Sequence, residues 1–148
     1  MTTSISLGER IARCLPGASF ELEALVRLVG IEETSTVSTA AVSCGQRTRL
    51  LVNPAFVAEH CVRDEHLFLL VMHEMWHVLL GHTTLFPAVT PTHNFIFDAV
   101  INGLLCRMFP AREHTALFTE FYDARNFPMC LLRPPPGWPE SDCCRATH

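Results

Sequence analysis

The sequence predicts a small α+β fold, and two observations support this prediction. Apolar residues recur at helical spacing in several stretches of the chain, whereas residues 34–53 are rich in the β-branched residues that favour strands. A chain of 148 residues that is 49% hydrophobic is large enough for one hydrophobic core and too small for two. We therefore expect a single domain over residues 1–125, followed by a tail over residues 126–148 that contains prolines and cysteines.

The first expected elements are a helix and a β-hairpin. Apolar residues in Phe20–Val29 repeat at helical spacing, and Gly30 can end that helix. Residues 34–43 and 47–53 are predicted to be two extended strands, joined by a turn at residues 44–46. The strand over residues 34–43 could be an edge strand that accepts an extended peptide through backbone hydrogen bonds.

Four further helices are expected to follow the hairpin. They span residues 54–61, 64–80, 91–108 and 111–122. Pro54 and Pro91 stand at first helical positions, where the missing N–H of proline costs nothing. Asp64 is the expected cap of the second of these helices, and Gly81 is its expected left-handed stop.

The charge and the distribution of apolar residues argue against several classes of protein. Fifteen acidic and eleven basic residues give a formal net charge of −4, which argues against a basic surface for nucleic acid. The most apolar run, residues 67–80, is shorter than the about 20 residues that cross a bilayer. The N-terminal residues lack the pattern of a signal peptide. We therefore expect a cytoplasmic protein without a nucleic-acid or membrane partner.

The seven cysteines do not indicate a disulfide scaffold, because their number is odd and a reducing cytoplasm is expected. Four of them lie in apolar or semi-apolar runs and are expected to be small buried hydrophobic residues, namely Cys14, Cys44, Cys61 and Cys106. Cys143 and Cys144 lie in the tail, after a proline-rich segment. The alternative to a purely structural tail is a segment that binds a protein partner.

The most informative motif lies in the most apolar of the expected helices. Between Leu67 and Leu80 the only residues that are not apolar are His73, Glu74 and His77, in the pattern H-E-x-x-H. Residues four apart lie on one helical face, so both imidazoles can reach one cation while Glu74 lies beside it. A catalytic zinc ion takes such ligands and keeps a position for water, whose proton Glu74 could accept. The alternative is a pair of core histidines with a surface-exposed Glu74.

A third metal ligand has to come from outside this motif, and Asp98 is the favoured candidate. Asp98 lies with Asn94 and Asn102 on one polar stripe of an otherwise apolar helix. Its carboxylate would complete a His-His-Asp site, and the two amides could orient it. The alternative is that Asp98 is a buried acid paired with an arginine such as Arg107 or Arg112.

Two further histidines are candidates for the same site. His82 follows His77 by five residues, just past Gly81, and is the rival third ligand. We favour for His82 a supporting role beside the ligands or at the helix C-terminus. His93 is the second candidate catalytic residue, because it is placed to contact a substrate or to steady an oxyanion, with His82 and Tyr122 as alternatives for that task.

These motifs together resemble a known family. The pattern H-E-x-x-H-x-x-x-G-H over His73–His82, the pattern N-x-x-x-D-x-x-x-N over Asn94–Asn102 and the preceding Leu51–Phe56 are similar to a zincin-type metallopeptidase domain of bacterial and phage proteins, often linked to von Willebrand A-like modules. The likeness covers roughly residues 37–105. It implies a minimal zincin-like fold, in which a β-hairpin or small sheet packs on an active-site helix and a second ligand-bearing helix.

The same resemblance implies roles for individual residues. His73 and His77 would be zinc ligands, Glu74 the catalytic base and Asp98 the third ligand. The expected function is therefore zinc-dependent hydrolysis of peptide bonds in a peptide or protein substrate. Two alternatives stay open: a non-catalytic zinc-stabilised module that binds a protein, and a metal-dependent hydrolase of a non-peptide substrate.

Overall fold

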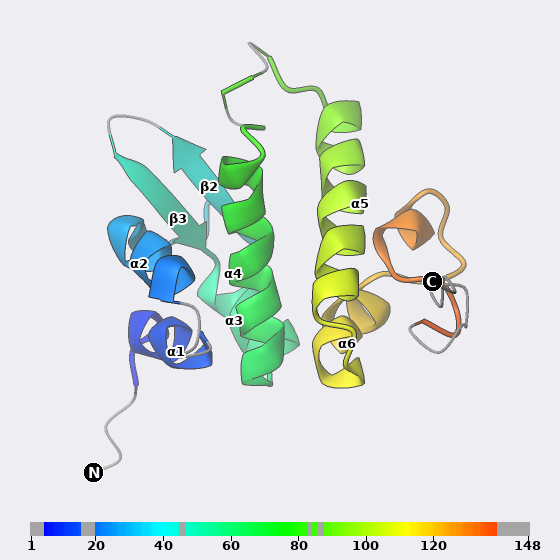
Figure 1. Cartoon of the computed structure of the whole chain (residues 1–148), viewed down its shortest axis with the longest axis horizontal. Coiled ribbons are helices and arrows are strands. Elements are labelled where there is room, and N and C mark those ends of the chain that lie inside the picture. Colours follow the sequence, from blue (N-terminus) through cyan, green and yellow to red (C-terminus); the bar gives the residue numbers. More distant parts are fainter. Residues whose placement is uncertain (1–4, 16–19, 45–46, 83, 86–87, 139–148) are drawn as a thin grey trace, which may run out of the picture.

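In the computed structural model, which describes residues 5–15, 20–44, 47–82, 84–85 and 88–138, a small sheet lies at one side of a group of helices (Figure 1). The described elements are, in chain order, α1 (Leu7–Cys14), α2 (Phe20–Leu28), β1 (Gly30–Glu33), β2 (Ala40–Cys44), β3 (Thr48–Val52), α3 (Pro54–His60), α4 (Asp64–Leu79), α5 (Pro91–Met108), α6 (Arg112–Phe121) and the 3₁₀ helix η1 (Met129–Leu132). The predicted α+β class is confirmed. None of the described helices is both long and apolar enough to cross a membrane.

The sheet contains the predicted hairpin and one strand that the sequence did not indicate. β2 and β3 pair antiparallel, with Val42 opposite Leu50, while the expected turn residues 45–46 lie outside the described residues. β1 pairs in parallel with the other edge of β3, so the strand order is β1-β3-β2. β1 was missed because it is short and largely exposed, with only Ile31 half-buried. Its parallel pairing also joins segments that are far apart in the sequence.

Residues 34–39 cross from one edge of the sheet to the other, so β2 is shorter than predicted. Asn53 holds this connection: its backbone N–H donates to the Thr39 carbonyl at 2.8 Å, and its side-chain amide donates to the Val37 carbonyl at 2.9 Å. The same side chain accepts from the Ala55 N–H at 2.9 Å and so caps α3. One asparagine therefore fixes the end of β3, the loop before β2 and the start of α3.

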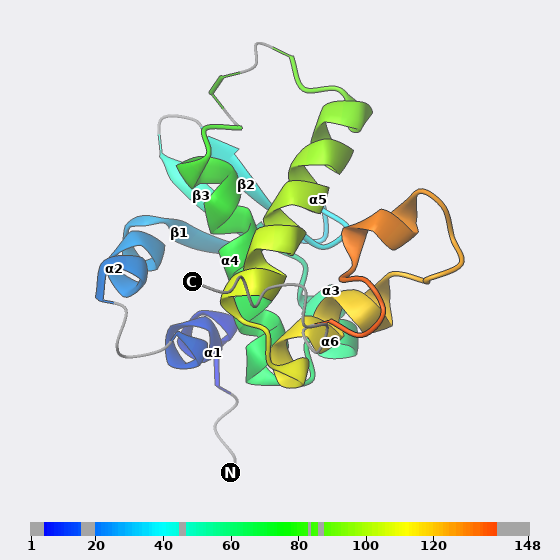
Figure 2. The same cartoon turned by 45° about the vertical axis from the view of Figure 1, so that its right-hand side comes forward.

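α4 forms the centre of the molecule, with the sheet on one side and α5 and α6 on the other (Figures 1 and 2). Leu67, Leu69 and Met75 of this helix are fully buried. The helix is therefore covered on nearly all sides, as its apolar sequence predicts. Gly81 follows the helix with a φ of 68°, which confirms the expected left-handed stop.

The prediction that Asp64 caps α4 is wrong. Asp64 is the first helical residue, the N-cap is Arg63, and no side-chain capping bond is formed there. The Asp64 carboxylate instead forms an ion pair with Arg10 of α1 at 3.0 Å, and Arg10 also donates to the Cys61 carbonyl at 2.6 Å. These contacts attach α1 to α4. α1 was not predicted from the sequence, although a capping box at residues 6–9 was the available signal.

α5 begins at its predicted cap, and part of its apolar surface stays exposed. The Thr90 hydroxyl accepts from the His93 N–H at 3.2 Å, as expected for a helix that starts there. Ile101 is fully buried against α4, whereas Ile96 and Val100 are 50% and 51% exposed. An apolar sequence is therefore not sufficient to predict that a helix is enclosed.

The described part of the tail packs against α5. The Trp138 indole N–H donates to the Cys106 carbonyl at 3.1 Å, and the Asn102 amide donates to the Leu132 carbonyl at 2.8 Å. Residues 129–138 thus cover part of the surface of the helical layer. A role of the proline-rich segment in binding a protein partner stays a prediction.

The described cysteines differ in their surroundings. Cys61 and Cys106 are buried as predicted, and burial raises the pKa of each thiol to about 11. Cys14 is half-buried. Cys44 is exposed, so its predicted burial is wrong, because the last residue of β2 lies beyond the core despite the apolar residues before it. The pair Cys143-Cys144 lies outside the described residues.

Candidate metal centre

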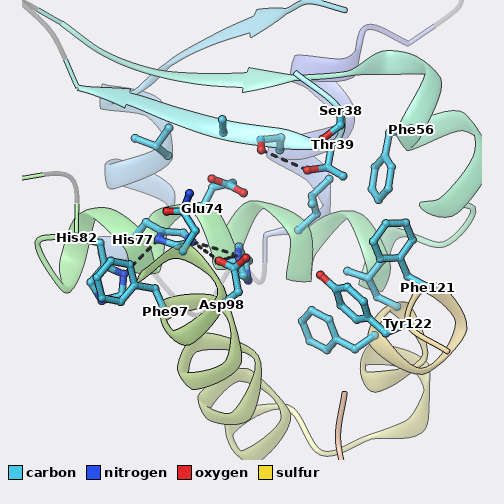
Figure 3. Close-up of a pocket in the computed structure, with 18 of the residues that line it drawn as sticks. Ser38, Thr39, Phe56, Glu74, His77, His82, Phe97, Asp98, Phe121 and Tyr122 are labelled. Atoms are coloured by element: carbon cyan, nitrogen blue, oxygen red, sulfur yellow. Dashed lines mark hydrogen bonds and ion pairs between the residues drawn. The ribbon is translucent and has the colours of Figure 1, made fainter. Parts of the chain in front are cut away.

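Two helices bring His73, His77 and Asp98 together. The histidines lie one turn apart on α4, and Asp98 of α5 contacts both of them. Figure 3 shows His77 and Asp98 side by side. The Oδ1 atom of Asp98 lies 3.3 Å from Nε2 of His73 and 3.1 Å from Nε2 of His77, and the two Nε2 atoms are 3.1 Å apart. In the part of the chain that the structure describes, these residues form a group that could hold a metal ion.

The spacing of these three atoms fits a small divalent metal ion. A tetrahedral ion that binds nitrogen and oxygen at about 2.0 Å holds its ligand atoms about 3.3 Å apart. Two imidazole nitrogens and a carboxylate oxygen in mutual contact also need a proton or a cation between them, because all three atoms carry lone pairs. Two histidines and one carboxylate are a donor set of catalytic zinc sites, in which a fourth position stays available for water.

The surroundings of Asp98 agree with this arrangement. Burial alone would raise the pKa of the Asp98 carboxyl, but hydrogen bonds from His73 and His77 and the charges of these rings lower it to about 2. The carboxylate therefore stays ionised, as a metal ligand must be. The alternative in which Asp98 is held by Arg107 or Arg112 does not describe this structure, since the partners of Asp98 are the two histidines.

Asn102 orients His73. The Nδ1 atom of His73 lies 2.8 Å from the Asn102 Oδ1, and the Asn102 amide nitrogen donates to the Leu132 carbonyl at 2.8 Å. Because that carbonyl can only accept, the amide oxygen faces His73 and accepts a hydrogen bond from Nδ1; in the neutral imidazole that binds a metal ion, Nε2 then keeps its lone pair toward the site. The sequence predicted that the asparagines orient Asp98, whereas Asn102 contacts a histidine. Asn94 is exposed and lines the same cleft.

The structure places His82 behind His77. Its Nδ1 atom lies 3.1 Å from Nδ1 of His77, the nitrogen opposite to the one that faces Asp98, and its ring stacks on Phe97 at 3.8 Å. The chain returns at Gly81, where the His82 N–H donates to the His77 carbonyl at 3.0 Å. Asp98, and not its rival His82, therefore shares the group of three ligand atoms with His73 and His77.

Glu74 lies beside the three candidate ligands and points toward β2 (Figure 3). The residue is only 7% exposed, which contradicts the alternative of a surface glutamate. Burial raises the pKa of the Glu74 carboxyl, while the nearby histidines and a hydrogen bond from the Val42 backbone N–H act in the opposite direction. The carboxylate is thus held next to the ligand set without belonging to it.

The free side of β2 forms one wall of a cleft at this centre. The Asn53–Thr39 hydrogen bond and the β2–β3 register place the backbone groups of Thr39 and Ala41 toward β3. In an antiparallel ladder the alternate residues, Ala40 and Val42, then direct their N–H and C=O groups away from β3. The cleft, of about 510 Å³, lies along this wall, with His73, Glu74, His77 and Asp98 in its lining.

Tyr122 also reaches the cleft, from the residue that follows α6. Its hydroxyl points toward Asp98 across the cleft (Figure 3). Burial, with the negative charge of Asp98 as a second cause, raises the pKa of the phenol to about 12, and a hydrogen bond from Asn102 opposes this shift. The hydroxyl therefore keeps its proton and can act as a hydrogen-bond donor.

His93 is placed differently from the other predicted residues. Its ring Nδ1 lies 3.4 Å from the Thr90 backbone N–H, so the side chain takes part in the N-terminal cap of α5. His93 is not among the residues that line the cleft. Its predicted catalytic role stays a prediction.

Several parts of the site were not visible in the sequence. The Val42 N–H reaches Glu74 because of the register of β2 on β3, and no local sequence pattern shows that register. The aromatic lining from α3 and α6, including Phe56 and Phe121, comes from helices that are far apart in the chain. Phe121 could have been found in the sequence only through its neighbour Tyr122, which is a candidate oxyanion donor.

Comparison with known proteins agrees with a metal-dependent site. A family model described as "Putative metallopeptidase domain" matches residues 12–120, which is most of the chain. No curated protein and no solved structure matches the chain. The matched residues include both ligand-bearing helices and all of β1, β2 and β3.

Proposed function

We propose, from the premise that the chain belongs to this metallopeptidase domain family, that it is a zinc-dependent peptidase that cleaves extended peptide segments. The observation that supports this proposal best is the convergence of His73, His77 and Asp98, with the Glu74 carboxylate beside them at the wall of a cleft. A zinc ion held by these three residues would supply a Lewis acid for the scissile carbonyl and for a water molecule. The remaining tasks belong to the residues of the chain.

Glu74 is the general base in this proposal. Its carboxylate takes a proton from the attacking water and passes it to the nitrogen of the leaving amine. The Val42 N–H holds the carboxylate in place, and the fixed position of α4 against β2 keeps it beside the ligands. Such a positioned base contributes about 10²- to 10⁴-fold to the rate.

β2 is the element that aligns the substrate. The N–H and C=O groups of Ala40, and the C=O of Val42, are directed into the cleft and can pair with the backbone of an extended peptide. The Ala40 carbonyl accepts a hydrogen bond from the Thr39 hydroxyl at 3.3 Å, a long contact that a peptide N–H can replace. Backbone pairing of this kind explains why a peptide is favoured over other hydrolysable substrates.

Tyr122 is the proposed donor to the oxyanion that develops on the scissile carbonyl. Its protonated hydroxyl points across the cleft toward the ligand set and is supported by Asn102. His93 is not part of this proposal, because its ring contributes to the cap of α5.

The test combines metal analysis with a substitution of the base. We expect the purified protein to carry about one zinc ion per chain, and Glu74→Gln to keep the metal while losing cleavage of unfolded proteins by about 100-fold or more. Metal content is measured by mass spectrometry and cleavage by peptide mapping of denatured casein. Glu120→Gln, the same change at an exposed residue of α6, is the matched control and should retain full activity. Equal cleavage by the Glu74→Gln variant and the unaltered protein would exclude Glu74 as the base.

A hydroxamate separates this proposal from a non-catalytic zinc module. A hydroxamate binds zinc only where a coordination position is available, so it should inhibit the peptidase and bind to it. A closed structural site should not bind the hydroxamate, and removal of its metal should unfold the domain.

A further inference from the structure

One end of the cleft is apolar and rich in aromatic rings. Its lining comes from three helices and is defined here as the aromatic end, consisting of Phe56 of α3, Leu70 of α4, and Leu117, Phe118 and Phe121 of α6. Tyr122 stands between the aromatic end and the ligand set (Figure 3). None of these side chains is needed for the proposed chemistry.

The aromatic end is built from side chains in fixed mutual contact. The rings of Phe56 and Phe121 pack edge to face with centroids 5.2 Å apart, and Phe121 packs on Tyr122 at 4.9 Å. Phe56 and Leu70 are each 8% exposed, whereas Phe121 is 39% exposed. Phe121 is therefore the accessible rim of a chamber whose deeper walls are held in the core.

The position of this chamber relative to the proposed base is set by α4. Leu70 and Glu74 are four residues apart and lie on one face of the helix, about 6 Å apart along its axis. An extended peptide repeats its side-chain direction every two residues, or about 6.6 Å. A peptide aligned on β2 with its scissile bond at Glu74 therefore brings a nearby side chain to the aromatic end.

We infer that the aromatic end is a specificity pocket that takes a large apolar side chain, aromatic or leucine-like, within two residues of the scissile bond. This inference rests on the proposed function. Water in such a chamber finds few polar partners, so its release to an apolar side chain is favourable, whereas a charged side chain would lose its hydration there. The substrates are thus extended segments that expose a large apolar residue, as unfolded or flexible parts of proteins do.

The first test measures ligand binding and does not require turnover. The zinc-loaded protein is titrated with two series of dipeptide hydroxamates, with the zinc-binding group at one end or the other, so that both sides of the reacting carbon are sampled. Within each series the compounds differ only by a benzyl, isobutyl, methyl or carboxymethyl side chain. We expect the benzyl or isobutyl compound of one series to bind at least about 10-fold more tightly than its methyl analogue, and the carboxymethyl compound to bind most weakly.

A matched pair of variants assigns that preference to the chamber. Phe121→Ala should reduce the ratio of benzyl to methyl affinity by at least about threefold, because it removes the rim of the chamber. Phe127→Ala makes the same change at a 78% exposed ring outside the cleft and should leave the ratio unchanged. Phe121→Trp, which narrows the chamber and keeps its packing, should lower the affinity for the benzyl compound if Phe121→Ala does not fold.

The outcomes separate this inference from the proposed function. If all hydroxamates bind with equal affinity, the specificity pocket is wrong while an accessible zinc site is supported. A preference that Phe121→Trp and Phe121→Ala both leave unchanged also overturns the assignment to the aromatic end. If none of the hydroxamates binds, both the pocket and the peptidase proposal fail.

Discussion

The two helices that carry the candidate metal ligands are both largely apolar in sequence, but they differ in their surroundings. α4 is enclosed by α1, α5, α6 and β2, and its residues from His66 to Met72 are all buried. α5 has Ile96 and Val100 half exposed, and it packs on α4 along one face and on η1 along another. The ligands on α4 are thus positioned by the core, whereas Asp98 depends on the contacts between the two helices. Some of those contacts are polar and lie at the candidate metal centre itself, so we expect metal binding there to be coupled to the packing of the two helices.

The largest expected effect is the loss of the ligand that joins the two helices. Asp98→Ala should weaken zinc binding by more than about 100-fold, since loss of a residue that only supports a ligand already costs about 10- to 100-fold. His82→Ala removes a residue behind His77 and should weaken binding by less than about 10-fold. Competition with a zinc-binding dye measures both affinities. The reverse ranking would show that His82 is the third ligand.

A smaller effect is expected where α5 supports a ligand of α4. Asn102→Ala should reduce zinc affinity by about 10- to 100-fold, because the His73 ring loses the acceptor that fixes its orientation. Asn94→Ala, the same change at an exposed position two turns earlier, is the control and should stay within about threefold of the unaltered protein. If both substitutions have equal effects on the dye competition, Asn102 does not orient His73.

The smallest expected effect is on the free energy of unfolding, and it comes from one valine-to-alanine substitution on each helix. Val71→Ala on α4 should lower the free energy of unfolding by about 2 kcal/mol, since its side chain is 1% exposed. Val100→Ala on α5 should change it by less than about 0.5 kcal/mol, since its side chain is 51% exposed. Urea unfolding of the metal-free protein measures both. Equal losses would show that the outer face of α5 is covered in solution.

The sequence was most informative where function follows from local spacing. His73, Glu74 and His77 lie within five residues of one helix, and the stripe through Asp98 follows from helical periodicity on the next. It was less informative where partners are distant in the chain. Asn102 could be placed on the correct face but not assigned to His73, because that contact depends on how α4 and α5 cross. Because apolar residues occur on nearly every face of this helix, the sequence also could not show that Val100 faces outward.

In the sheet, too, the pairings between segments that are distant in the chain could not be predicted from the sequence. The hairpin was predicted from its β-branched residues and turn, whereas β1 pairs in parallel with β3 across the intervening crossover and β2, a pairing that no local pattern shows. The side of β2 that faces the cleft follows from the register with β3 and from the Asn53–Thr39 bond. The sequence could suggest the edge strand as a candidate for peptide binding, but it could not show which of its residues direct their backbone into the site.

The hydrogen bonds of Asn53 limit how far the loop at the rim of this cleft, residues 34–39, can be lengthened. Because its hydrogen bonds to Val37 and Thr39 join the crossover to the start of α3, the rim of the cleft has a fixed number of residues between two anchored points. An inserted residue in 34–39 would have to bulge outward or break the hydrogen bonds of Asn53 to this segment. Without those bonds the Asn53 side chain would be less well placed to cap α3, the helix that carries Phe56. Changes in how a substrate enters the cleft are therefore easier to accommodate by exchanging side chains at this rim than by lengthening it.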